Sequence, residues 1–239
     1  MIEQTRNSIQ TFQHKLLSIE TWLDALLPSR CAACDTISNL QLICTLCQST
    51  ICLARSNNNS PETVSIFSYS AAVKKIIVEA KFCRNENKAR SLISYWAKLT
   101  SKESLLEKLG NTHFDAVCFV PVHWRRRLWR GFDLSALFAI EVSRQLNLPL
   151  LDLLISKRLD KPLTLAHNKT ERENMTKDRF LIKKSRHLSL SILLVDDVTT
   201  TGATLHVATK ALQGSGHKVR ALTLAKTPDR LSKTELRGN

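Results

Sequence analysis

The sequence predicts an α/β protein in which helices flank a parallel sheet and a small cysteine-rich module precedes it. Apolar strands alternate with helices through the second half of the chain, as in parallel sheets that are covered on both faces. Two Cys-x-x-Cys pairs lie nearer the N-terminus, ahead of a polar run that is typical of a linker. A length of 239 residues suits one ordinary domain plus a small appendage.

We therefore expect three units along the chain. Residues 1–28 carry apolar side chains at helical spacing and end at Pro28, which predicts an amphipathic lead-in helix. Residues 29–55 form the cysteine module, and the polar run over 56–61 separates it from a main domain over 62–239.

The main domain should alternate strands and helices. The expected elements, in order, are a strand over 64–69, a helix carrying Val73, Ile76, Ile77 and Ala80, a helix over 86–109 with Leu92, Ile93, Trp96 and Leu99 on one face, a strand over 116–120, a helix over 133–146, a strand over 191–195, a helix over 202–213 and a strand over 218–225. The segment 157–187 is polar and basic, and only a short helix around 169–175 is expected in it.

Composition limits the classes of function. The chain has 35 Lys and Arg against 21 Asp and Glu, a formal net charge of +14, which attracts nucleic acid, anionic membrane surfaces or phosphorylated small molecules without choosing among them. Hydrophobic residues make up 43% and charged residues 23%, which excludes wholesale disorder. Charged side chains interrupt the apolar stretches near the N-terminus, so we expect no membrane span and a cytoplasmic protein.

The cysteine pairs predict a structural zinc site. Cys31 and Cys34 form one C-x2-C pair, and Cys44 and Cys47 form a second pair after nine intervening residues. Two such pairs supply the closed tetrahedral sulfur site of structural Zn²⁺, although redox-active or independent buried pairs are the alternative. Cys52 is an alternative fourth ligand. Two remaining thiols, Cys83 and Cys118, are expected in or near the core.

An acidic pair followed by a hydroxyl-rich turn is the most informative stretch. An apolar strand leads into Asp196 and Asp197, at the strand end where open α/β sheets bind ligands. The turn that follows then opens a helix, so its N–H groups, hydroxyls and helix dipole can hold a phosphate. The carboxylates can accept hydrogen bonds from sugar hydroxyls or hold a divalent cation, which predicts a ribose-5-phosphate clamp. An ordinary N-capped helix is the alternative.

A second cluster lies between the strand over 116–120 and the next helix. Four arginines, Arg127 and Arg130 among them, are interleaved there with aromatic residues. They could grip pyrophosphate oxygens or stack on nucleic-acid bases. The alternative is a solvated basic loop with aromatic anchors.

The segment 192–204 resembles the phosphoribosyl-pyrophosphate (PRPP) signature of the type I phosphoribosyltransferase fold. Together with the paired cysteines and the stretch Pro-Val-His…Arg-x-x-Arg-Gly-Phe-Asp, it makes the chain similar to the ComF family of amidophosphoribosyltransferase-like proteins. The resemblance implies a type I phosphoribosyltransferase-like sheet, PRPP bound with Mg²⁺, and structural Zn²⁺. It assigns PRPP binding to Asp196, Asp197, Thr199, Thr200, Thr201, Gly202, Ala203 and Thr204, with both acids in the catalytic position. Lys81 matches a basic position of the family and is a candidate pyrophosphate contact, or else a surface lysine.

Three functions remain open at this point. The resemblance implies a ComF-type protein that binds PRPP or another ribose-5-phosphate compound and assists uptake or processing of single-stranded DNA in natural transformation, with DNA-uptake or processing proteins as partners. A metabolic phosphoribosyltransferase with a nitrogenous acceptor and a non-catalytic PRPP-sensing or DNA-binding module are the alternatives. Leu134 stands where the family often has Gln, and a later segment with Arg172, Asn174 and Phe180 lacks the Gln that often precedes it. The acceptor is therefore not indicated.

Overall fold

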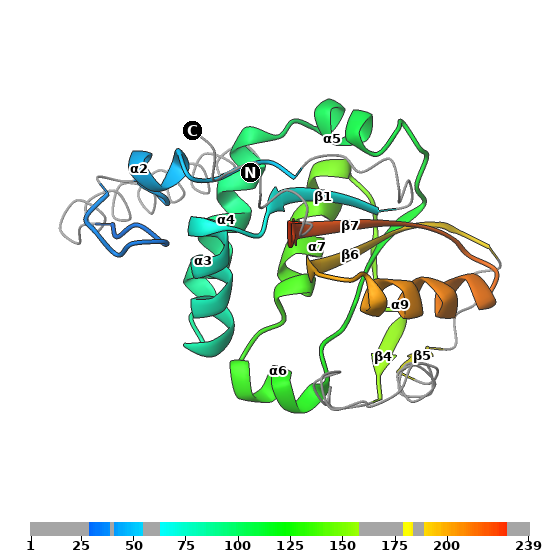
Figure 1. Ribbon diagram of the computed structural model, residues 1–239. Coiled ribbons are helices and arrows are strands. Elements are labelled where there is room, and N and C mark those ends of the chain that lie inside the picture. The colour runs from blue at the N-terminus through cyan, green and yellow to red at the C-terminus, as the bar shows by residue number, and fades with distance from the viewer. Residues whose placement is uncertain (1–28, 39–40, 55–62, 158–178, 184–188, 229–239) are drawn as a thin grey trace, which may run out of the picture.

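The computed structural model describes most of the chain (Figure 1). The described ranges are 29–38, 41–54, 63–157, 179–183 and 189–228. The expected lead-in helix, the linker and the short helix around 169–175 lie outside these ranges.

A five-stranded parallel sheet forms the centre of the molecule, in the order β1-β7-β6-β2-β3. Its strands are β1 (Thr63–Ser68), β2 (Ala116–Phe119), β3 (Leu150–Leu151), β6 (Ser191–Thr199) and β7 (Lys218–Lys226). A separate antiparallel pair consists of β4 (Leu154–Ser156) and β5 (Phe180–Ile182). The prediction of a parallel sheet flanked by helices is confirmed, and β6 lies at its centre.

The helices follow the expected order with two differences. Their bounds are α2 (Thr45–Gln48), α3 (Ala71–Phe82), α4 (Glu86–Leu99), α5 (Lys102–Lys108), α6 (Trp124–Arg130), α7 (Leu134–Leu146) and α9 (Ala203–Gly214). The single helix expected over 86–109 is wrong, because Thr100 is extended and the Ser101 side chain caps a new helix by accepting from the Ser104 N–H at 3.2 Å. Leu99, expected on the buried face, is exposed at the end of α4.

Both faces of the sheet are covered, because successive side chains of a buried strand point to opposite sides. In β6, Leu193 and Val195 belong to the core shared with α3, α4 and α7, whereas Ile192 and Leu194 belong to the core shared with α9 and the β4–β5 pair. Figure 1 shows α9 and α7 on opposite faces of the sheet. An apolar run is therefore required in the central strand.

Helix α6 is the second difference, since this stretch was expected only as a loop between a strand and a helix. The buried His123 begins the helix by accepting the Arg125 N–H through Nδ1 at 3.3 Å, and Gly131 ends it at φ 86°. None of its own residues is buried. Caps rather than an apolar face define this helix, so hydrophobic periodicity could not reveal it.

Two smaller expectations can be compared with the structure. Cys118 is buried in β2, as expected, and burial raises the pKa of its thiol to about 11. Cys83, expected in or near the core, is exposed at the end of α3. Within the described ranges, no helix is long and apolar enough to span a membrane.

Candidate functional site

The acidic pair lies at the carboxyl end of the central strand. Strand β6 continues to Thr199, so Asp196 lies within the ladder, opposite Thr223 of β7. The side chains of both aspartates are almost fully buried, with exposed fractions of 7% and 8% for Asp196 and Asp197. The sheet therefore fixes the direction of both carboxylates before any ligand is bound.

Lys81 of α3 is the counter-ion of Asp197. Its Nζ lies 2.7 Å from Asp197 Oδ2, and both side chains are largely buried. The other carboxylate oxygen, Oδ1, accepts the Val198 N–H at 2.6 Å. The structure thus brings two of the predicted site residues, from segments more than a hundred positions apart, into one ion pair.

Two hydrogen bonds hold Asp196. Its Oδ1 accepts the Ser135 hydroxyl at 2.9 Å and the Asp197 N–H at 2.8 Å. Burial, followed by the neighbouring Asp197 charge, raises the pKa of Asp196 to about 7. The two acids therefore have different partners, because a cation faces Asp197 and neutral donors face Asp196.

A third buried carboxylate, missed by sequence reasoning as a site residue, lies near the pair. Asp133 caps α7 by accepting the N–H groups of Ser135 and Ala136, and its second oxygen accepts the Val122 N–H at 3.0 Å. Burial and then the Asp197 charge raise the pKa of Asp133. An Asp immediately ahead of an apolar helix is a sequence signal for such a cap, although it does not reveal the Ser135 bond to Asp196.

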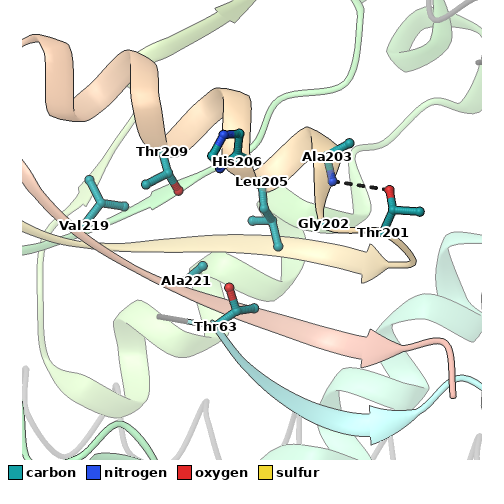
Figure 2. Close-up of a pocket in the computed structure, with 9 residues that line it drawn as sticks. All are labelled: Thr63, Thr201, Gly202, Ala203, Leu205, His206, Thr209, Val219 and Ala221. Atoms are coloured by element: carbon teal, nitrogen blue, oxygen red, sulfur yellow. Dashed lines mark hydrogen bonds between the residues drawn. The ribbon is translucent and has the colours of Figure 1, made fainter. Parts of the chain in front are cut away.

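The hydroxyl-rich turn joins β6 to α9. Gly202 is the N-cap of α9 at φ 74°, in the left-handed region that favours glycine, and the Ala203 N–H is 3.4 Å from Thr201 Oγ1 (Figure 2). The first N–H groups of a helix lack intrahelical partners, so this end of α9 presents donors and a positive dipole end. Thr199, also predicted to bind, is buried at the end of β6.

A cavity of ≈ 360 Å³ lies beside this turn, between α9 and the edge of the sheet (Figure 2). Its lining residues are Thr63, Thr201, Gly202, Ala203, Leu205, His206, Thr209, Val219 and Ala221. The turn at the start of α9 therefore borders open space rather than packed side chains.

The predicted arginine cluster is displayed on α6. Arg127 is exposed and Arg130 is half-buried, and neither takes part in the Lys81–Asp197 ion pair. The rings of Trp124 and Trp129 are 59% and 49% exposed, and the Arg125 guanidinium lies 5.3 Å from the centre of the Trp124 ring. Strands β2 and β6 are parallel, so their carboxyl ends lie at the same edge of the sheet. Helix α6 follows β2 and therefore begins at the edge where the acidic pair lies.

The four predicted cysteine ligands form a cluster, which has the donor set of a metal site. The Sγ atoms of Cys31, Cys34, Cys44 and Cys47 all lie within 4.8 Å of one another, and the Cys34 and Cys44 sulfurs are 3.7 Å apart. A tetrahedral Zn²⁺ with Zn–S bonds of about 2.3 Å needs sulfurs about 3.8 Å apart. Cys52 is exposed outside this cluster.

Hydrogen bonds favour the thiolate form at Cys31 and Cys34, whereas burial raises the pKa of Cys47. Cys31 Sγ accepts the N–H groups of Ala33 and Cys44 at 3.4 and 3.3 Å. Burial opposes ionisation of Cys31, but its backbone N–H bonds outweigh burial and lower its pKa. The Thr36 hydroxyl, 2.7 Å from Cys34 Sγ, lowers the pKa of Cys34 to about 6. The donors present thus fit a soft divalent cation.

Comparison with known proteins adds sequence evidence. The phosphoribosyl transferase domain family matches residues 133–237. Competence protein ComFC of Bacillus subtilis is 26% identical over 199 residues, which cover 82% of this chain and 78% of that protein. Competence protein F of Haemophilus influenzae is 29% identical over 111 residues, which cover 43% of this chain and 45% of that protein.

Solved structures with some similarity are also phosphoribosyltransferases. The purine phosphoribosyltransferase from Pyrococcus horikoshii Ot3 has a TM-score of 0.35 and 21% identity, covering 55% of this chain and 74% of its own. The adenine phosphoribosyltransferase from Leishmania tarentolae has a TM-score of 0.39 and 11% identity, covering 73% of this chain and 94% of its own.

The matched segment contains the acidic pair, the hydroxyl-rich turn and the helix that follows it. Together with the parallel sheet, this match defines a phosphoribosyltransferase-like domain. The cysteine cluster lies ahead of that domain in the chain, and the similarity to ComFC runs over most of the sequence. The chain therefore resembles the ComF family in its competence-protein relatives, its phosphoribosyl transferase match and its cysteine cluster.

Proposed function

We propose that this ComF-type protein binds PRPP with Mg²⁺ at the carboxyl end of β6 and assists the handling of single-stranded DNA in natural transformation. The observation that carries the proposal is the continuous path from a buried acid pair, through a hydroxyl-rich turn, to the start of α9. The competence proteins among its relatives support the role in transformation.

Each part of PRPP has a matching group in this path. Asp196 and Asp197 would accept hydrogen bonds from the ribose hydroxyls, as buried carboxylates readily do. The N–H groups and hydroxyls over 200–204 would hold the 5′-phosphate, because the start of a helix favours an anion. Thr199 would act through the backbone at the beginning of this turn, since its side chain is buried.

Lys81 is the residue most directly suited to the pyrophosphate side. In the structure it compensates the charge of Asp197 from 2.7 Å. A pyrophosphate group that binds near the acid pair would compete with Asp197 for the Lys81 ammonium. Lys81 would then pair with Asp197 in the free protein and with pyrophosphate in the complex. Arg127 and Arg130 would contact pyrophosphate or DNA, and arginine suits either because its fork binds phosphate oxygens in pairs.

The oxygen donors of the acid pair fit a hard cation such as Mg²⁺, which Asp196 and Asp197 would hold together with oxygens of PRPP. When bound, Mg²⁺ supplies charge neutralisation on pyrophosphate as it leaves the anomeric carbon. If the protein is catalytic, its own residues mainly orient the ribose and exclude water around the buried carboxylates.

The exposed face of α6 is the proposed contact for single-stranded DNA. Two exposed tryptophans lie among four arginines on this helix. Aromatic rings that stack on bases, combined with cations that follow the phosphates, are the usual means of binding single strands without sequence preference. The cysteine cluster would hold structural Zn²⁺, because a closed four-sulfur site leaves no position for a substrate.

Calorimetric titration of the zinc-loaded protein with PRPP, with and without Mg²⁺, tests the first half of the proposal. We expect binding that strengthens with Mg²⁺ and that Asp197→Asn weakens about tenfold or more, since a charged hydrogen-bond acceptor is lost. Asp152→Asn is the matched control, because Asp152 is exposed and pairs with Lys183. A folded wild-type protein that does not bind PRPP would refute the PRPP site.

Fluorescence anisotropy with a labelled oligonucleotide tests the second half. Trp129→Ala should weaken binding of single-stranded DNA and leave PRPP binding unchanged. Arg127→Ala should also weaken DNA binding, and its effect on PRPP binding shows whether Arg127 contacts pyrophosphate as well. Arg144→Ala, on the exposed face of α7, should change neither. Affinity should fall steeply with salt. If Arg144→Ala weakens DNA binding as much as the α6 variants do, the binding depends on net charge alone and not on α6.

Pyrophosphate release with a panel of bases and amines separates the remaining alternatives. Release with one nitrogenous acceptor and no DNA binding would favour a metabolic phosphoribosyltransferase. PRPP or DNA binding without release would favour the non-catalytic module.

A further inference from the structure

An arginine outside the predicted site reaches the turn at the start of α9. Arg179 Nη1 donates to Thr204 Oγ1 at 3.1 Å. Thr204 belongs to the turn proposed to hold the 5′-phosphate, whereas Arg179 directly precedes β5 of the separate antiparallel pair. Two segments that are independent in the sheet topology therefore meet at this turn.

The position of Arg179 is set by its own packing. Its carbonyl accepts the Lys157 N–H at 2.9 Å, which extends the β4–β5 pairing by one residue. The next residue, Phe180, is buried in the core beneath α9, and the Arg179 guanidinium lies 5.4 Å from the centre of its ring. The side chain is thus directed at α9 by a hairpin that is itself anchored in the core.

A phosphate dianion at the start of α9 would be stabilised by a side-chain cation in addition to the positive end of the helix dipole. Between Asp196 and Thr209 the chain has no Lys or Arg, so the turn itself offers no side-chain cation to a phosphate dianion. Arg179 supplies the missing charge from another element.

The direction of the hydrogen bond adds to this argument. A threonine hydroxyl that accepts from a guanidinium keeps its own proton for donation. Thr204 can therefore donate to a phosphate oxygen while it accepts from Arg179. A guanidinium offers several donors in one plane, so Arg179 could bind a phosphate oxygen as well as Thr204.

We propose that Arg179 is a ligand of the 5′-phosphate, completing from the β4–β5 pair the anion cradle formed by the turn over 200–204. The inference rests on the proposed function and deepens it, since it assigns the 5′-phosphate to one side of α9 and names its cationic partner. It also gives the β4–β5 pair a role in recognising the substrate.

The test compares ligands that share or lack the 5′-phosphate. Calorimetry on the full, zinc-loaded chain would measure affinity for ribose 5-phosphate, PRPP and inorganic pyrophosphate in the presence of Mg²⁺. Arg179→Gln should weaken ribose 5-phosphate and PRPP about tenfold to a hundredfold and leave pyrophosphate unchanged. Arg179→Lys, which keeps the charge but not the fork, should lie between these values. Arg144→Gln removes an exposed arginine from α7 and should change nothing.

The outcomes separate the two proposals. A wild-type protein that binds neither ribose 5-phosphate nor PRPP would overturn the site and the role of Arg179 together. A wild type that binds both, with Arg179→Gln binding them equally well, would overturn the role of Arg179 alone. Proportional loss of all three ligands with a lowered melting temperature would show that Arg179 only anchors the hairpin, which also overturns its role as a ligand.

Discussion

The cysteine cluster and the acidic pair both gather groups that carry negative charge, but different parts of the molecule hold them together. The four sulfurs lie within 4.8 Å of one another in a segment whose only described helix, α2, has four residues. The two aspartates lie on the central strand of a five-stranded sheet, with a hydrophobic core on each face. The cysteine cluster therefore has little regular structure around it, whereas the acidic pair lies in the most regular part of the fold.

The two regions obtain their counter-charge from different sources. Thiolates at this spacing need a divalent cation from solution, so we expect the geometry of the cluster to depend on Zn²⁺. The acid pair is compensated from within the chain, by the Lys81 ammonium and by N–H and O–H donors. Removing metal should therefore affect one region, and substitution of single side chains should affect the other.

Loss of zinc should give the largest effect. Cys34→Ser, or treatment with a strong chelator, should abolish the binding of one zinc per chain, and the folding free energy at stake is about 10 kcal/mol by analogy with zinc-finger peptides. Metal analysis and thermal unfolding would measure it. Cys52→Ser is the control, because Cys52 is exposed outside the cluster, and it should keep both zinc and stability. Equal loss of zinc in both variants would contradict the four-ligand assignment.

The pH dependence of stability should reveal Asp196. Its pKa is raised from 3.8 to about 7 in the folded protein, mainly by burial, so the folded chain binds more protons than the unfolded chain between about pH 4 and pH 7. Stability from this group is present at low pH and is lost as pH rises through that window. At pH 8 the loss amounts to at most about 4 kcal/mol.

Asp196→Asn removes this titration and keeps an acceptor for the Ser135 hydroxyl. The variant should therefore gain stability over the wild type progressively from pH 4 to pH 8, as measured by urea unfolding at several pH values. Asp152→Asn, at an exposed carboxylate, should run parallel to the wild type. A difference between Asp196→Asn and wild type that is constant with pH would contradict the raised pKa.

Breaking the internal ion pair should have an intermediate effect. Lys81→Met leaves the largely buried Asp197 without its cation, which we expect to cost about 3 kcal/mol in the free energy of unfolding. Lys75→Met, at a half-exposed position of the same helix, should change it by less than about 0.5 kcal/mol. Asp197→Asn should restore part of the stability lost in Lys81→Met. If it restores none, Lys81 stabilises α3 by packing rather than by charge.

The sequence predicts most of the fold, because continuous apolar runs mark the buried strands and apolar side chains at helical spacing mark the helices. The sequence predicts a strand that ends at Val195. In the structure this strand continues to Thr199, because its pairing with β7 extends to the Thr199–Lys226 pair. Such an extension depends on the neighbouring strand, which local pattern does not contain. Helix α6 was missed for a related reason, since its limits come from His123 and Gly131 rather than from an apolar face.

The candidate site is predictable only in part. The acids, the turn and the cysteine pairs are contiguous in sequence, so their spacing alone identifies them. Lys81 could be named only through a resemblance. Its pairing with Asp197 could not be predicted, because the contact joins α3 to β6. Ser135 and Arg179 carry no local signal at all. Their roles arise from tertiary packing that brings distant segments to the same edge of the sheet.

Three glycines give the smallest and sharpest comparison. Gly202 and Gly131 both have a left-handed φ, 74° and 86°, and an added Cβ would meet nothing closer than Thr199 Oγ1 at 3.9 Å for Gly202 and nothing within 4 Å for Gly131. Alanine at either position should therefore cost only the backbone conformation, about 1 kcal/mol. Gly214→Ala, at the end of α9 with free space and no such φ, should instead add about 0.5 kcal/mol.

Ligand binding should separate the two destabilised glycine variants. Gly202→Ala would turn the first amides of α9 away from the phosphate and weaken ribose 5-phosphate binding, whereas Gly131→Ala should lower the melting temperature equally and bind ribose 5-phosphate like the wild type. Thermal unfolding and calorimetry on the same samples would measure both effects. Equal weakening in both variants would mean that binding follows global stability, which would contradict a phosphate site at the start of α9.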